Sequence, residues 1–350
     1  MQFSQIINAR LNKDNDRPLM QKETYPVSPA LQKYLQQYKR DIPLPVTYKE
    51  LLHYRYTDSI KDEDGRHTHW ENVVYEASLF KQLQKKLSTT YALLKKINAE
   101  NIEVKTIDFC EFANSMPFRI VVENTGTGEA DIFYVKSADA SRVYGLELEH
   151  LLSPNPTNFL YHQNTLIEEH IEGIPGDIFL KEAEMATGDE RKLIAEEFVR
   201  FNERCFVRLL GDMRSYNFVV VKNENTIHIR AIDFDQQCYE GKLNLYLPQF
   251  YKENYSYVQM ALSVFGSTAI EEIRKDEREK LTTEMKQSGK RLNGLLEVMA
   301  PEEISENYKV LVLRKELDEY FKTSHFALCQ TMGSIVNHQV RQLLGPPDYQ

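Results

Sequence analysis

Apolar and polar residues alternate through the middle of the chain, which is the pattern of half-buried β-strands. We expect five strands, at residues 102–109, 118–123, 131–136, 158–162 and 165–171. A turn rich in glycine at 124–128 joins the second of these strands to the third, as in an antiparallel meander. The run that ends at Leu152 has its apolar residues on one side, so we expect a helix between the third and fourth strands.

The first hundred residues are polar and rich in tyrosine, and helix-like segments near 47–56 and 70–98 predict an N-terminal helical extension. His67 and His69 have the spacing of a metal-binding pair. Because no acidic or sulfur partner follows at a recognisable distance, we interpret them as part of a solvated turn before the helix.

The second half of the chain is mainly helical. A long apolar-faced helix is expected at 188–210, and several more between 246 and 344. A short hairpin at 217–221 and 226–233 interrupts them. A small sheet with one helix, followed by a helical half that contains a hairpin, predicts an α+β fold.

Charge and composition narrow the possible functions. The chain has 43 Lys and Arg against 52 Asp and Glu, a net charge of -9, which argues against a protein that coats nucleic acid. No apolar run approaches the ~18 residues of a membrane helix, and the start lacks the layout of a signal peptide, so we expect a cytoplasmic protein without a membrane partner. The cysteines are far apart and are expected to be reduced and buried: Cys110, Cys205, Cys238 and Cys329.

The sharpest motif lies where the long helix ends and the hairpin begins. It reads Gly211-Asp212-Met213-Arg214-Ser215-Tyr216-Asn217, and Ile232-Asp233-Phe234-Asp235 follows the second hairpin strand. These residues resemble the protein-kinase-like superfamily, with its H-R-D-L-x-x-x-N and D-F-G motifs. In style they are closest to the aminoglycoside and choline kinases, with H-G-D-x-x-x-x-N and I-D-F/W-D.

The resemblance implies a two-lobed fold with a small antiparallel sheet lobe and a mainly helical lobe. The lobes would span residues 101–172 and 173–350, after the extension at 1–100. The motifs that carry the resemblance lie within roughly residues 102–240.

The resemblance also implies ATP and Mg²⁺ as cofactors and assigns roles to the matching residues. Asp212 would orient or deprotonate the acceptor hydroxyl, and Arg214 would face the transferred phosphoryl group. Asn217 and Asp233 would bind the metal, with Asp235 as an additional carboxylate.

A second group of residues would hold the nucleotide. In Phe133-Tyr134-Val135-Lys136, Lys136 resembles the lysine that binds the α- and β-phosphates, and Glu147 on the next helix is its expected ion-pair partner. The segment 166–176 resembles the hinge that joins the lobes, where backbone groups of Glu169 and Ile171 would contact adenine.

Three residues or segments depart from the family pattern. The loop 110–117 has no glycine where kinases cover the phosphates, so either a wider loop would use the Ser115 hydroxyl or the nucleotide would be held more weakly. Leu210 replaces the histidine of the catalytic loop. Tyr134 shares a strand face with Lys136 and would either stack on the base or block it.

The sequence therefore predicts an ATP- and Mg²⁺-dependent phosphotransferase that acts on a small-molecule or protein hydroxyl. Two alternatives stay open: a nucleotide-binding pseudokinase that serves as an interaction module, and an atypical enzyme that transfers the nucleotidyl group to protein. Nothing in the sequence identifies the acceptor.

Overall fold

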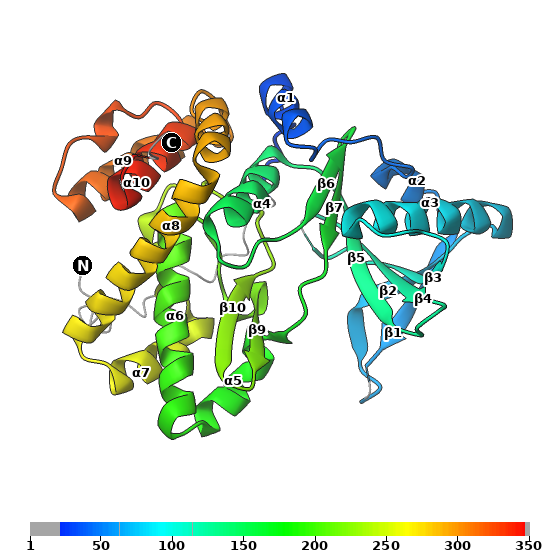
Figure 1. Cartoon of the computed structure of the whole chain (residues 1–350), viewed down its shortest axis with the longest axis horizontal. Helices are drawn as coiled ribbons and strands as arrows, with labels where there is room; N and C mark the ends of the chain where they lie inside the picture. Colours follow the sequence, from blue (N-terminus) through cyan, green and yellow to red (C-terminus); the bar gives the residue numbers. More distant parts are fainter. Residues whose placement is uncertain (1–21, 63, 114, 347–350) are drawn as a thin grey trace. The chain divides into compact units, whose positions relative to one another are not determined.

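The computed structural model describes residues 22–62, 64–113 and 115–346. Over this range the chain forms two compact units (Figure 1). Residues 22–140 and 157–170 form the first, which is built on a seven-stranded sheet and is called the sheet unit here. Residues 141–156 and 171–346 form the second, called the helical unit. The fold class is α+β, as predicted.

The sheet unit is an antiparallel sheet with three helices. Its strands are β1 (Tyr56–Lys61), β2 (His67–Val74), β3 (Ile102–Phe109), β4 (Phe118–Asn124), β5 (Ala130–Ser137), β6 (Phe159–His162) and β7 (Thr165–Glu169). They lie in the order β1-β2-β3-β4-β5-β7-β6. Its helices are α1 (Pro29–Gln37), α2 (Tyr48–Leu51) and α3 (Ala77–Lys95). The five predicted strands are all present, within a few residues of the expected bounds.

The expectation of a separate helical extension was wrong for residues 56–74, which form β1 and β2. These strands extend the sheet, since β2 pairs with β3 through Glu71 and Asn72. The predicted helix at 70–98 begins only at Ala77, and the one at 47–56 is the single turn of α2. His67 and His69 lie on β2 and not in a turn. The compact unit therefore runs across the boundary expected at residue 100.

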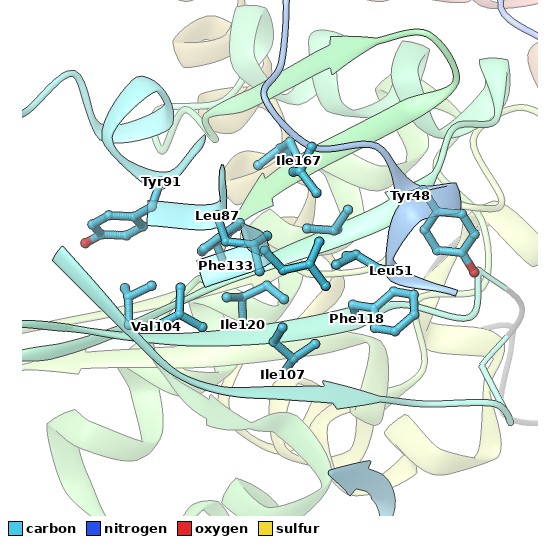
Figure 2. Packing of buried hydrophobic residues seen from close by; sticks show 14 of the residues in the cluster. Tyr48, Leu51, Leu87, Tyr91, Val104, Ile107, Phe118, Ile120, Phe133 and Ile167 are labelled. Carbon is cyan, nitrogen blue, oxygen red and sulfur yellow. The ribbon is translucent and has the colours of Figure 1, made fainter. Parts of the chain in front are cut away.

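The core of the sheet unit lies on one face of the sheet. Leu87 and Tyr91 of α3 pack there against strand residues such as Ile120 and Phe133 (Figure 2). The helix α2 adds Tyr48 and Leu51 to the same cluster. Because alternate strand residues point to this face, the residues between them must point to the opposite one.

The helical unit contains seven α-helices, a small sheet and short 3₁₀ turns within the described residues. Its helices are α4 (Ala140–Leu152), α5 (Gly176–Met185), α6 (Gly188–Arg208), α7 (Tyr255–Val264), α8 (Ser267–Met299), α9 (Asn307–Phe321) and α10 (Met332–Leu344), of which α4 begins one residue before the unit does. Its strands β8 (Ile174–Pro175), β9 (Phe218–Asn223) and β10 (Thr226–Ala231) form a sheet in the order β10-β9-β8. The 3₁₀ turns are η2 (Ser215–Asn217), η3 (Leu243–Tyr246), η4 (Pro248–Phe250), η5 (Lys252–Asn254) and η6 (Phe326–Leu328).

The long helix α6 organises this unit. It packs against α7, α8 and β10, and most of its second half is buried. Its charged residues are satisfied inside the fold: Arg204 donates to Glu197 and Glu277, at 2.6 and 2.9 Å, and to the carbonyl of Ile229. These contacts fix the end of α6, from which the motif loop departs.

Two further expectations can be compared with the structure. All four cysteines are free and buried, as predicted. None of the helices in the described ranges is both long enough and apolar enough to span a bilayer.

Candidate functional site

The motif loop connects α6 to β9 within the helical unit. The helix ends at Arg208 and is capped by Leu209, whose φ of 53° is left-handed, and Asp212 also has a positive φ of 57°. The loop then closes through two backbone hydrogen bonds, from Arg214 N to Asp212 O at 2.9 Å and from Asn217 N to Arg214 O at 2.8 Å. A left-handed backbone is unfavourable for aspartate, so the surrounding contacts must hold this geometry.

The carboxylate of Asp212 is held by its own loop. Arg214 donates from Nε to Oδ1 at 2.7 Å, and the Asn217 amide donates to the Asp212 carbonyl at 2.7 Å. Burial raises the pKa of Asp212 to about 6; the adjacent Arg214 opposes the increase, and the charges of Asp233 and Glu253 add to it. The side chain is 17% exposed, so it is reachable from solvent.

Two residues that the sequence analysis missed support this loop. Arg214 donates from Nη1 to Glu253 at 3.0 Å, and its guanidinium lies 5.0 Å from the centre of the Tyr251 ring. The Tyr251 hydroxyl donates to Leu245 O at 2.8 Å and accepts the Asp212 N–H at 3.0 Å. Tyr251 thus contacts the backbone of one predicted site residue and the side chain of another.

The second motif, at 232–235, is tied to the same loop. Ile232 donates its N–H to the Asn217 carbonyl at 3.0 Å, and Asp233 is close enough to Asp212 to influence its pKa. The structure therefore places Asp212, Arg214, Asn217 and Asp233 close to one another, and the roles assigned to them from the motifs stay predictions.

Arg142 on α4 is the third residue that the sequence analysis missed. It donates from Nη2 to Asp233 Oδ1 at 2.7 Å and from Nε to Asp235 Oδ1 at 2.6 Å. Ser141 beside it donates to the carbonyls of Asp235 and Gln237. The first turn of α4 is consequently hydrogen-bonded to the segment that carries two of the three predicted metal ligands, Asp233 and Asp235.

The oxygen donors present suit a magnesium ion that keeps most of its other ligands from water or phosphate. Magnesium is commonly held by one or two carboxylates together with substrate phosphates. Asn217, Asp233 and Asp235 supply an amide and two carboxylates, and Asp233 is 31% exposed. No cluster of three or more His, Cys, Asp or Glu that could hold a metal ion occurs in the described part of the chain.

The residues predicted to bind the nucleotide are divided between the units. In the sheet unit, Lys136 donates to Glu168 at 2.8 Å, and both are buried. In the helical unit, Glu147 accepts two hydrogen bonds from Arg291, at 2.7 and 2.9 Å. Each residue of the predicted Lys136–Glu147 pair thus has a partner within its own unit, and their mutual pairing stays a prediction.

Of the remaining predicted residues, Glu169 lies at the end of a strand, and Ser115 and Ile171 lie outside the strands. Ser115 is half-buried in the loop between β3 and β4. Glu169 ends β7, and its N–H already donates to Asn158 O at 3.2 Å, which leaves that group engaged and not free for adenine. Ile171 is buried, at the start of the second stretch of the helical unit.

No family model matches this sequence, and no curated protein matches it.

Proposed function

We propose that this chain is an ATP- and Mg²⁺-dependent phosphotransferase with a kinase-like two-lobed fold. The observation that carries the proposal is the motif loop. In it, Arg214 and Asn217 both donate hydrogen bonds to Asp212, and Asp233 lies nearby. Phosphoryl transfer requires a carboxylate at the acceptor hydroxyl and oxygen ligands for the metal, and this loop supplies both. A turn that merely ended a helix would not need this set.

The sheet unit supports the same reading. Lys136 lies near the end of β5, the third strand of the β3-β4-β5 meander, and α4 follows directly. This is the order that the resemblance to kinases requires of the phosphate-binding lysine and the helix after it.

In this proposal each residue has a defined role. Asp212 orients the acceptor hydroxyl and receives its proton, and Arg214 stabilises charge on the transferred group. Asn217, Asp233 and Asp235 hold the metal, which would neutralise charge on the phosphates when it is bound. Lys136 contacts the nucleotide phosphates, assisted by the Ser115 hydroxyl.

One observation favours a second candidate, a nucleotide-binding protein without turnover. Arg142 neutralises Asp233 and Asp235, the two carboxylates that a catalytic metal would need. If Arg142 keeps these two ion pairs, its guanidinium takes the place of the metal ion, and the protein transfers no phosphate.

The test is calorimetric titration of ATP with Mg²⁺ into the whole chain, followed by transfer assays with α- and γ-labelled ATP. We expect metal-dependent binding that Asp233→Asn weakens, and transfer of the γ-label that Asp212→Asn reduces ~100-fold or more. Asp189→Asn, an exposed carboxylate of the same unit, is the matched control.

The outcomes separate the candidates. Binding without label transfer would favour the non-catalytic protein, and transfer of the α-label would indicate nucleotidyl transfer. Absence of binding at millimolar nucleotide would contradict all three.

A further inference from the structure

The face of the sheet opposite its hydrophobic core carries a row of partly buried polar and aromatic residues. Asp108 lies between the core residues Ile107 and Phe109, Arg119 between Phe118 and Ile120, and Tyr134 between Phe133 and Val135. By strand alternation all three central residues point away from the core. They are also direct cross-strand partners, because Asp108 pairs with Arg119 and Arg119 with Tyr134.

The charge in this row is neutralised in place. Arg119 donates from Nε and Nη2 to the same oxygen of Asp108, at 2.9 and 2.8 Å, and Asn72 donates to the other oxygen at 3.1 Å. The Asp108 side chain is 3% exposed and that of Arg119 is 25% exposed. The guanidinium is therefore fixed as a flat group with its charge already compensated.

Aromatic rings gather around this flat cation. The Arg119 guanidinium lies 4.6 Å from the Trp70 ring centre, and Trp70 and Tyr134 lie 6.2 Å apart at an interplanar angle of 31°. The Tyr134 hydroxyl is 2.9 Å from His170 Nδ1, which holds the ring in orientation. The ammonium of Lys136 lies 5.4 Å from the centre of the Tyr134 ring.

We propose that Trp70, Arg119 and Tyr134 form a stacking platform for the base of a mononucleotide. This inference rests on the proposed function and adds to it Trp70 and Arg119, which no motif indicated. Flat aromatic and guanidinium groups bind nucleobases through their faces, and the neighbouring Lys136 suits the phosphate that a mononucleotide carries.

The charge of the face favours a single nucleotide over a nucleic-acid strand. Strand binding requires a groove of uncompensated positive charge along the backbone. Here Arg119 is paired with Asp108 and Lys136 with Glu168. A single base matches this surface, with Lys136 as the one cation near its phosphate, whereas a run of phosphates would need several uncompensated cations.

Trp70 makes the platform directly testable because it is the only tryptophan of the chain. Its fluorescence, excited at the red edge of its absorption, is followed while adenosine, AMP, ATP or GTP is added to the full-length protein without metal. Base-free tripolyphosphate is the control ligand. We expect a saturable change with the nucleoside and nucleotides and none with tripolyphosphate.

Variants then assign the effect to the platform. Tyr134→Ala should weaken AMP binding roughly tenfold or more, which corresponds to the loss of one stacking contact. Tyr134→Phe keeps the ring and should retain most of the affinity. Tyr56→Ala removes an exposed tyrosine of the same unit and should leave affinity unchanged. Calorimetry on Trp70→Ala, with circular dichroism to confirm folding, should show the same loss as Tyr134→Ala.

Three results would overturn the inference: no response to adenosine or AMP at millimolar concentration, an equal response to tripolyphosphate, or much tighter binding of an oligonucleotide than of AMP. The transfer assay separates this inference from the proposed function. Base binding without transfer would support the stacking platform and contradict the kinase proposal. Transfer of the γ-label with no change in Trp70 fluorescence would support the kinase proposal and contradict the platform.

Discussion

Arg142 donates to Asp233 at 2.7 Å, so an arginine from α4 occupies one side of the carboxylate that the motif assigns to a metal. Its side chain is only 3% exposed, and its Nε binds Asp235 as well. A divalent cation and Arg142 would therefore compete for the same negative charge.

Removing this competitor should strengthen metal binding. We expect Arg142→Gln to bind Mn²⁺ at least ~10-fold more tightly than the wild type, because the two carboxylates lose their internal counter-charge. Calorimetry with Mn²⁺ alone provides the measurement. Arg142→Lys retains a positive charge, so its Mn²⁺ affinity should lie between those of the wild type and Arg142→Gln. Unchanged Mn²⁺ affinity in both variants would show that Arg142 does not compete with the metal.

The raised pKa of Asp212 predicts how stability depends on pH. A carboxyl with a folded pKa of about 6, against an ordinary 3.8, favours its protonated form in the fold. This contribution to stability is complete below pH 4 and is lost as the pH rises through 6. We expect Asp212→Asn to be more stable than the wild type at pH 8, by up to about 3 kcal/mol, and to show little difference at pH 4.

Urea unfolding of both proteins at the two pH values measures this difference. Arg214 loses a partner in the variant but keeps Glu253, so part of the gain will be offset. A wild type that is more stable than Asp212→Asn at pH 8 would argue that the Arg214 contact outweighs the cost of burial.

Tyr251 is expected to act as a positioning residue for Asp212. In Tyr251→Phe the hydroxyl that accepts the Asp212 N–H is lost, at a cost of about 1–2 kcal/mol in unfolding free energy. Label transfer should fall while nucleotide affinity stays the same. Tyr246→Phe is the matched control, because it removes another buried tyrosine hydroxyl, which donates to Glu240 O at 2.6 Å, without touching Asp212. Equal transfer in both variants would limit Tyr251 to a structural role.

A close helix contact offers a test of the packing of the helical unit. A Cβ added to Gly333 on α10 would lie 1.8 Å from the Met299 carbonyl at the end of α8. Because backbone atoms cannot move aside cheaply, Gly333→Ala should destabilise the fold by about 2–3 kcal/mol or more. Gly266→Ala, where the added methyl meets nothing within 4 Å, should have a much smaller effect in the same thermal unfolding experiment.

Strict alternation made the central strands predictable, as in β4, where Phe118, Ile120 and Val122 all point into the core. The same rule failed for β1, which has no buried residue in its burial pattern, so its sequence carries no alternating signal. Whether an edge strand forms depends on pairing with its neighbouring strand, and the alternation of apolar and polar residues along the chain does not show this pairing.

In the candidate site, too, contacts between residues close in sequence could be predicted, and contacts between distant residues could not. Asp212 and Asn217 are five residues apart in one loop, and their contact is local enough to be expected from a motif. Arg142 reaches Asp233 from 91 residues away along the chain, and Tyr251 approaches Asp212 from 39 residues away. Such partners depend on how helices and loops pack, which the spacing of residues alone does not specify.

The attachment of α4 to the segment 233–237 also decides how this protein can be dissected. Residues 141–156 belong to the helical unit, although they lie in sequence between two stretches of the sheet unit. A single cut in the gene therefore cannot release either unit intact: ending the chain at residue 172 would leave α4 without the loop it is bound to, and starting there would leave Asp233 and Asp235 without Arg142. Swapping either unit with another protein would require exchanging two separated pieces of sequence at once.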